Sequence, residues 1–115
     1  GKFRPSGLTT LEKNKLINDA KKIENAGAFS IVLECVEKNI SKKITKQLNI
    51  PTIGIGSSVN CDGQILVTDD IIGLSGFHPK FIKKYVDIKK IIEKAIKKYR
   101  SDVIKKKFPS RKNSY

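Results

Sequence analysis

Three short apolar runs, each bounded by turn-forming residues, are the feature that most limits how this chain can fold. They occupy residues 29–34, 50–56 and 64–68 and are rich in the isoleucine, valine and leucine that buried strands prefer. A segment with helical periodicity precedes the first run, and another separates it from the second. This alternation is typical of parallel βα units, so we expect an α/β fold.

The helix boundaries are marked by capping residues in the first half of the chain. Thr9 and Glu12 have the spacing of a capping box, which predicts a helix that runs to about Asn25. Ala26-Gly27 supplies the expected stop for that helix. Isoleucine and leucine at every fourth position predict a second helix over residues 39–48.

The second half of the chain contains one long helical pattern. Asp87 is a suitable N-cap for a helix that we expect to reach about Lys105. Before it, residues 69–80 are predicted to form an apolar-rich loop, and residues 81–86 a short helical turn. The tail over residues 107–115 is expected to be mobile.

Composition limits the class of protein. The chain has 115 residues, which is enough for one modest domain with a single core. No apolar run approaches the roughly 18 residues of a membrane span. Cys35 and Cys61 lie far apart and lack the spacing of a zinc site, which predicts a protein of the reducing cytoplasm.

The formal net charge of +13 raises the question of a nucleic-acid partner. Nearly all of the 24 basic residues are lysines, whereas recognition of bases and phosphates favours arginine. The lysines follow helices at solvent-facing spacing, and no motif for reading bases accompanies them. The sequence therefore disfavours a nucleic-acid-binding module.

Glu34 ends the first apolar run. A charge at the end of a buried strand is costly unless another group pairs with it or a reaction uses it. The carboxyl ends of parallel strands are where α/β enzymes place their chemistry. The alternative is that Glu34 pairs with one of the many lysines, and the spacing favours neither interpretation.

Three collinear blocks of sequence resemble a known family. They are Ile31–Val36, Ile50–Gly56 and Cys61–Val67, followed by Asp70, Gly73 and Pro79–Phe81. Together they closely resemble ketopantoate hydroxymethyltransferase (3-methyl-2-oxobutanoate hydroxymethyltransferase). The resemblance covers essentially all of this chain, but only about the C-terminal half of the family's chain.

The resemblance implies a partial (β/α)8 TIM barrel, comprising about the last three strands with their helices and the C-terminal helix. Residues 1–115 would form the C-terminal part of one barrel domain. The family assembles as a decamer, so a homo-oligomer is expected, or else a complementing N-terminal half from another chain.

The resemblance also implies a reaction. The family transfers a one-carbon unit from 5,10-methylenetetrahydrofolate to the 2-oxo acid 3-methyl-2-oxobutanoate, with Mg²⁺ held by residues of the half that is absent here. Glu34 stands where the family has its proton acceptor. Strand alternation puts Val32 on the same face as Glu34. It also places Ile55, Ile65 and Val67 beside Glu34 as an apolar wall for the substrate's isopropyl group, although plain core filling explains each one equally well.

The sequence departs from the family pattern at Glu37, where the family usually has proline, and at Ser57, Ser58 and Asp69. These positions are on or near the expected active-site face. These departures fit either relaxed constraint or tolerated variation. Two interpretations therefore remain: a portion of the enzyme with Glu34 as its base, or a non-catalytic remnant or interaction subunit of it.

Overall fold

The computed structural model describes residues 4–76 and 79–115, which form two compact units. The first unit takes in the chain up to Val67 together with Pro79–Ile82, and the second takes in the rest. Positions 77 and 78, inside the loop predicted over 69–80, lie outside the described residues. Each unit is considered by itself below.

The first helix, α1 (Thr10–Asn25), confirms the predicted capping box. The Thr9 hydroxyl accepts a hydrogen bond from the Glu12 amide at 3.2 Å, and the Glu12 carboxylate accepts one from the Thr9 amide at 3.2 Å. The predicted stop is confirmed as well, because Ala26 caps the helix and Gly27 turns the chain with a φ of 92°.

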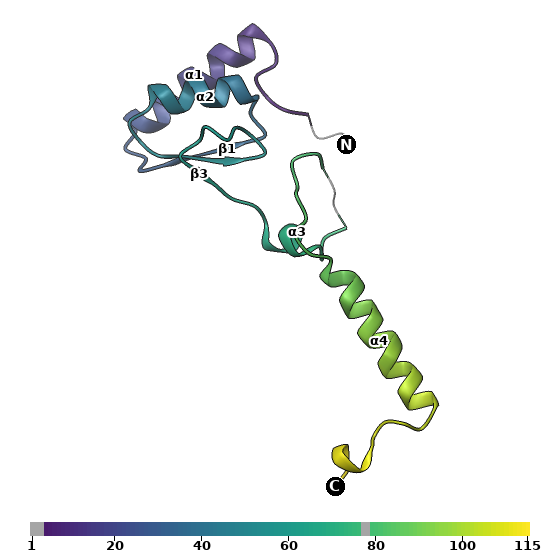
Figure 1. Ribbon diagram of the computed structural model, residues 1–115. Coiled ribbons are helices and arrows are strands. Elements are labelled where there is room, and N and C mark those ends of the chain that lie inside the picture. The colour runs from purple at the N-terminus through teal and green to yellow at the C-terminus, as the bar shows by residue number, and fades with distance from the viewer. Residues whose placement is uncertain (1–3, 77–78) are drawn as a thin grey trace. The chain divides into compact units, whose positions relative to one another are not determined.

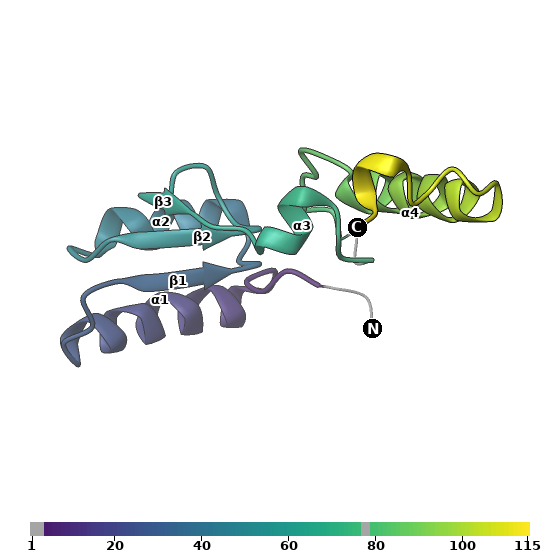
Figure 2. The same ribbon diagram turned by 90° about the horizontal axis from the view of Figure 1, so that it is seen from below.

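The first unit is built on a parallel sheet of three strands in the order β1-β2-β3. The strands are β1 (Ile31–Glu34), β2 (Thr52–Ile55) and β3 (Gly63–Gln64), and α2 (Lys38–Gln47) connects the first two. In Figure 2 the arrows of β1 and β2 point the same way. The predicted α/β class is confirmed by this arrangement.

The first two strands are shorter than the apolar runs that predicted them. Ile31 pairs with Thr52, so pairing would next require Pro51, which has no amide hydrogen to give. At the other end, Gly56 has a φ of 63° and turns β2 away from the sheet. Pro51 contributes only its carbonyl, which accepts a hydrogen bond from the Ile31 amide at 3.0 Å. Residues 29–30, 50 and 56 lie outside the ladder, and Phe29 is 87% exposed.

The third strand was predicted over 64–68 and is in fact the two residues Gly63–Gln64. The Ile65 amide still donates to the Gly54 carbonyl at 3.0 Å. Beyond that point β2 has already turned at Gly56, so Leu66 and Val67 have no strand beside them. The prediction was wrong here because the length of an edge strand is set by its neighbour.

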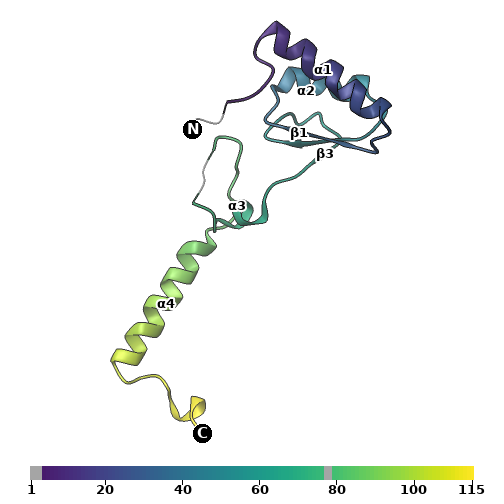
Figure 3. The same cartoon turned by 180° about the vertical axis from the view of Figure 1, so that it is seen from behind.

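Both helices of this unit lie on the same side of the sheet, as Figures 1 and 3 show. Leu33 of β1 is 4% exposed and Ile44 of α2 is 1% exposed. The buried core cluster comprises Ala20, Leu33, Val36, Ile40, Ile44 and Cys61. Burial of apolar surface between α2, α1 and β1 is therefore what holds this unit together.

The opposite face of the sheet carries Val32, Glu34, Ile53 and Ile55, which we call the open face. Val32 is paired with Ile53, and Glu34 with Ile55, so the four share one side of the pleat. Val32 is 53% exposed and Glu34 is also exposed. Among the described residues of the first unit, no helix covers this face (Figure 1).

A polar network anchors the start of β2. The Asp62 carboxylate accepts hydrogen bonds from the Thr52 amide at 2.8 Å and from the Thr52 hydroxyl at 3.0 Å. The Thr52 hydroxyl also lies 2.8 Å from that of Thr45, which donates to the Ser41 carbonyl. Since Thr52 and Ser41 are both fully buried, these bonds satisfy polar groups that water cannot reach.

Asp62→Asn is expected to destabilise the first unit in a pH-dependent way. The Thr52 amide, and then its hydroxyl, hold the pKa of the Asp62 carboxyl below its ordinary value of 3.8. A lowered folded-state pKa means that the stabilisation is complete above that ordinary value and is lost as the pH falls through the folded-state pKa. The difference in urea midpoint between parent and variant should therefore stay constant from neutrality down to the ordinary pKa of 3.8 and shrink at lower pH.

Asp19→Asn on α1 is the matched control, because the Asp19 carboxylate makes no hydrogen bond or ion pair with any described residue. A difference between parent and Asp62→Asn that stayed constant from neutral pH to strongly acidic pH would contradict this account of Asp62.

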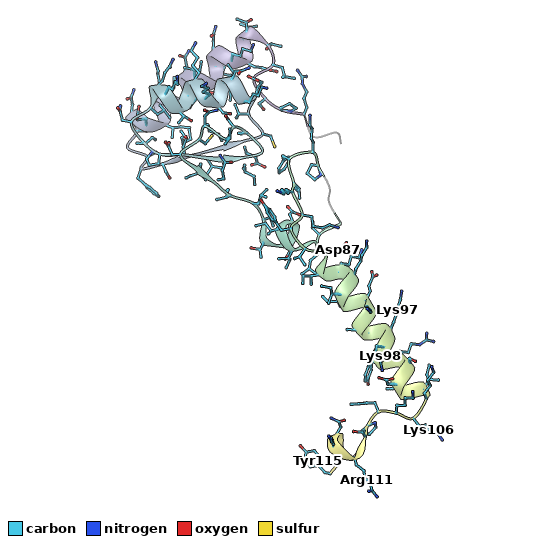
Figure 4. The ribbon with its side chains drawn as sticks, in the orientation of Figure 1. Asp87, Lys97, Lys98, Lys106, Arg111 and Tyr115 are labelled. Atoms are coloured by element: carbon cyan, nitrogen blue, oxygen red, sulfur yellow. The ribbon has the colours of Figure 1, made fainter. Side chains whose placement is uncertain are left out.

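The second unit contains α3 (Thr68–Ile72), α4 (Ile88–Ile104) and a 3₁₀ turn over Arg111–Asn113. The predicted Asp87 cap of α4 is confirmed, since the Asp87 side chain accepts from the Lys90 amide at 3.3 Å. Figure 4 shows side chains projecting on both sides of this helix, and none of its residues is buried.

Two predictions for this unit were wrong. Residues 68–72 form a helix instead of the end of a strand and the start of a loop, and Asp69 and Asp70 occupy its first turn, where carboxylates favour a helix. Residues 81–86 are not helical, because the Tyr85 amide bonds to the Ile71 carbonyl at 2.9 Å instead of to its own turn. Over the described part of the chain, no helix has both the length and the apolar character needed to cross a membrane.

Candidate functional site

Glu34 is the last residue of β1 and projects on the open face, beside its pairing partner Ile55. The predicted alternation thus places Val32 and Glu34 on the same side of the strand. Its carboxylate makes no hydrogen bond or salt bridge with any of the residues that the structure describes. The alternative interpretation, in which Glu34 pairs with a lysine, therefore finds no support in residues 4–76 and 79–115.

Immediately after Glu34 the chain makes a left-handed turn at Cys35, whose φ is 51°. Residues with a side chain adopt this region rarely and at some cost. The Cys35 amide donates to the Ile55 carbonyl at 2.8 Å, and the Cys35 carbonyl accepts from the Ser6 amide at 2.9 Å. The turn thus connects β1 both to β2 and to the N-terminal segment.

The Ser57 hydroxyl bridges the two sides of this turn. It donates to the Leu33 carbonyl at 2.6 Å and accepts from the Val36 amide at 3.0 Å. Glu34 and Cys35 lie between the two bonded residues. A serine at the end of β2 therefore closes the loop of backbone that carries Glu34.

The neighbouring residue Glu37 has a structural place as well. Its carboxylate caps α2 by accepting from the amides of Asn39 at 2.9 Å and Ile40 at 3.2 Å. Its own amide donates to the Ser6 carbonyl at 2.9 Å, a bond that proline at this position could not make. This departure from the family pattern is therefore accommodated by local bonding.

The three residues predicted to form the apolar wall lie in different environments. Ile55 is on the open face and half-buried, directly beside Glu34. Ile65 follows β3 in register and is 48% exposed, whereas Val67 lies outside the sheet and is 55% exposed. Ile55 therefore lies beside Glu34, and Ile65 is hydrogen-bonded to β2. Val67 is not part of the ladder.

The carboxyl end of β2 is covered by Phe81. A Cβ added to Gly56 would lie 2.7 Å from the Phe81 Cγ atom, so only glycine fits there, and its φ of 63° also favours glycine. The Phe81 ring therefore rests directly on the backbone that lies between Ile55 and Ser57. Sequence reasoning did not find this contact, since 25 positions separate the two residues.

The described residues contain no group of three or more histidine, cysteine, aspartate or glutamate side chains that could hold a metal ion. Asp62 is committed to Thr52, and the Asp70 carboxylate accepts from the Ser75 hydroxyl. Burial, and then the charge of Glu34, raise the pKa of the Cys35 thiol, which disfavours a nucleophilic thiolate. Glu34 is the group whose placement suits acid–base chemistry.

The sequence of residues 1–111 matches the pattern that defines the ketopantoate hydroxymethyltransferase family. This chain belongs to that family. Its relatives named 3-methyl-2-oxobutanoate hydroxymethyltransferase include proteins from Pelagibacter ubique at 51% identity, Carboxydothermus hydrogenoformans at 46% and Saccharolobus islandicus at 49%. The alignments cover 98%, 100% and 98% of this chain.

The same alignments cover 44%, 42% and 42% of the three relatives. The chain thus spans less than half the length of the ketopantoate hydroxymethyltransferases that it matches. The resemblance drawn from the three sequence blocks is confirmed, including its restriction to part of the family's chain. Within that part, sequence reasoning singled out Glu34 as a candidate but missed Ser57 as a contact of the strand that carries it.

Proposed function

We propose that this chain is the C-terminal portion of a 3-methyl-2-oxobutanoate hydroxymethyltransferase. The proposed enzyme transfers a one-carbon unit from 5,10-methylenetetrahydrofolate to 3-methyl-2-oxobutanoate. The product, ketopantoate, would serve pantothenate biosynthesis in the cytoplasm. The observation that carries the proposal is the family match over residues 1–111, with Glu34 at the carboxyl end of a parallel strand.

In this proposal Glu34 accepts the proton from the substrate carbon next to the carbonyl. Three features support that role: the carboxylate ends a parallel strand, it projects on the open face, and it has no partner among the described residues. A general base has to be free to reach the proton that it removes. Ile55, Ile65 and Val67 are the proposed apolar contacts of the substrate.

The Mg²⁺ ion of the proposed enzyme would make that proton acidic by binding the 2-oxo acid. The described residues do not fit a metal site, because their carboxylates and thiols form no cluster. We therefore assign the metal ligands to the part of the enzyme that lies outside this chain, and give this chain the proton acceptor and part of the apolar wall.

The open edge of β1 supports a partial (β/α)8 barrel as the architecture. Ile31 donates its amide to the Pro51 carbonyl just before β2, and Cys35 donates to the Ile55 carbonyl at the end of β2. The backbone groups of Val32 and Glu34, which alternate with these, are therefore directed toward the other edge. Another parallel strand could pair there, and further strands would enclose the open face. We propose that a complementing N-terminal half supplies them, within a homo-oligomer.

Co-production with the N-terminal part of the Pelagibacter ubique relative, up to the point where the match begins, tests this function. We expect the two pieces to co-purify and to form ketopantoate with Mg²⁺ and methylenetetrahydrofolate, and this chain alone to form none. Product from this chain alone would contradict the assignment of the metal ligands. A folded, co-purifying but inactive complex would instead favour a non-catalytic interaction subunit.

A further inference from the structure

The turn that follows β1 carries an inference about Ser57. We propose that Ser57 is a positioning residue for Glu34. Its hydroxyl fixes the left-handed turn at Cys35 and thereby sets the direction in which the Glu34 carboxylate projects from the open face. This inference rests on the proposed function of Glu34. It concerns a residue at the end of β2, 23 positions along the chain from the carboxylate that it positions.

The two hydrogen bonds of Ser57 enclose Glu34. Its hydroxyl donates to the Leu33 carbonyl, on the residue before Glu34, at 2.6 Å. The same oxygen accepts from the Val36 amide, two residues after Glu34, at 3.0 Å. A hydroxyl is the one small group that can donate and accept at once, so the bridge uses both of its capacities.

The turn requires such support because Cys35 is not glycine. A side chain at a φ of 51° is strained, and such a conformation persists only where surrounding contacts enforce it. The backbone bonds of Cys35 to Ile55 and Ser6 hold the centre of the turn at 2.8 and 2.9 Å. Ser57 adds the tie between the two ends, and it is the one side chain among the described residues that does so.

The Val36 amide depends on this tie. Val36 is 6% exposed, so water cannot readily replace a hydroxyl that is removed from its amide. Without the Ser57 oxygen, the chain after Glu34 would have to move in order to satisfy that donor. Any such movement rotates the Cα–Cβ bond of Glu34, and a base misplaced by about 1 Å can lose much of its rate.

Ser58 provides a matched control. Its hydroxyl is the next one along the chain and is buried, but it accepts from the Asn60 amide and side chain, each at 3.1 Å. Ser58→Ala therefore removes one hydroxyl from the same loop without touching the turn at Cys35. Ser57→Thr keeps the hydroxyl and is the variant expected to rescue Ser57→Ala.

The first measurement is amide hydrogen exchange at Val36 in the complex with the N-terminal part, read by NMR or by mass spectrometry of short peptides. Ser57→Ala should lower the protection of Val36 by about tenfold or more, since the opening that exposes an amide becomes easier when its partner is gone. Ser57→Thr and Ser58→Ala should leave it near the parent value. Unchanged protection in Ser57→Ala would overturn the proposal.

The second measurement follows exchange of the substrate's C–H proton with deuterated water in the same complexes. Ser57→Ala should slow this step about tenfold at saturating substrate with the half-saturating concentration nearly unchanged, because a displaced base alters the reaction and not the binding. Ser57→Thr should restore the rate. A parent-like rate in Ser57→Ala, or equal slowing in Ser58→Ala, would overturn the proposal.

Glu34→Gln separates this proposal from the function on which it rests. If Glu34→Gln abolishes proton exchange while Ser57→Ala does not slow it, only the positioning role fails. If Glu34→Gln exchanges at the parent rate, the base itself has been misassigned, and the positioning role fails with it.

Discussion

Glu34→Gln in the complex with the complementing half is expected to lower turnover by about 10²–10⁴-fold, the usual contribution of a general base. Glutamine keeps the size and shape of the side chain but cannot take the proton. The hydrogen bonds around the turn at Cys35 involve backbone and Ser57, so the variant leaves them in place. Steady-state production of ketopantoate gives the measurement.

The matched control for this prediction is Glu93→Gln on α4, because the Glu93 carboxylate is exposed and makes no hydrogen bond or ion pair with any described residue. It should retain the parent rate. Binding of the 2-oxo acid should change little in Glu34→Gln, so the loss is expected in kcat and not in KM. A loss confined to KM would contradict the assignment of Glu34 as the base.

Ile44→Ala is expected to have the largest effect on stability, about 2–5 kcal/mol. Ile44 is 1% exposed, in α2, at the centre of the cluster between both helices and the sheet. Removing three carbons there loses buried contacts and leaves a cavity. In a unit with so small a core, a loss of this size should leave much of the chain unfolded at room temperature.

Urea unfolding, followed by circular dichroism at one fixed protein concentration, provides the test. Ile23→Ala is the matched control, since Ile23 lies on α1 of the same unit and is 43% exposed. It should shift the midpoint far less than Ile44→Ala. Equal shifts in the two variants would mean that the cluster around Ile44 does not hold the first unit together.

The helices α1, α2 and α4 were predictable because their signals are local. Thr9 and Glu12 cap α1 from within four residues, and Asp87 caps α4 in the same way. The helix over 39–48 was predicted one residue late, because Glu37 caps it and Lys38 is its first residue. Capping bonds join residues that are close in sequence, and for that reason they can be recognised there.

The ends of the strands and the structure of the segment after the sheet could not be predicted from local signals. β3 stops at Gln64 because β2 turns away at Gly56, although the apolar run itself continues to Val67. Similarly, the amide of Tyr85 bonds to Ile71, so the predicted helical turn over 81–86 does not form. In each case the deciding partner lies elsewhere in the chain.

The candidate site shows the same division. Alternation along β1 predicted that Val32 and Glu34 share a face, and the register confirms this. It did not predict that the face would be exposed here, because that depends on the elements that cover the sheet. The bond from Ser57 to Leu33 spans 24 positions, and only the pairing of β1 with β2 brings the two residues together.

Proton exchange at the branching carbon of 3-methyl-2-oxobutanoate is the most direct test of the central claim. The complex with the complementing half is incubated with Mg²⁺ and substrate in deuterated water, without folate, and loss of the C–H signal is followed by NMR. Omitting folate isolates the proton transfer from the one-carbon step. We predict ready exchange with the parent and exchange slowed by about two orders of magnitude or more with Glu34→Gln. Equal exchange rates in the two complexes would show that Glu34 is not the base.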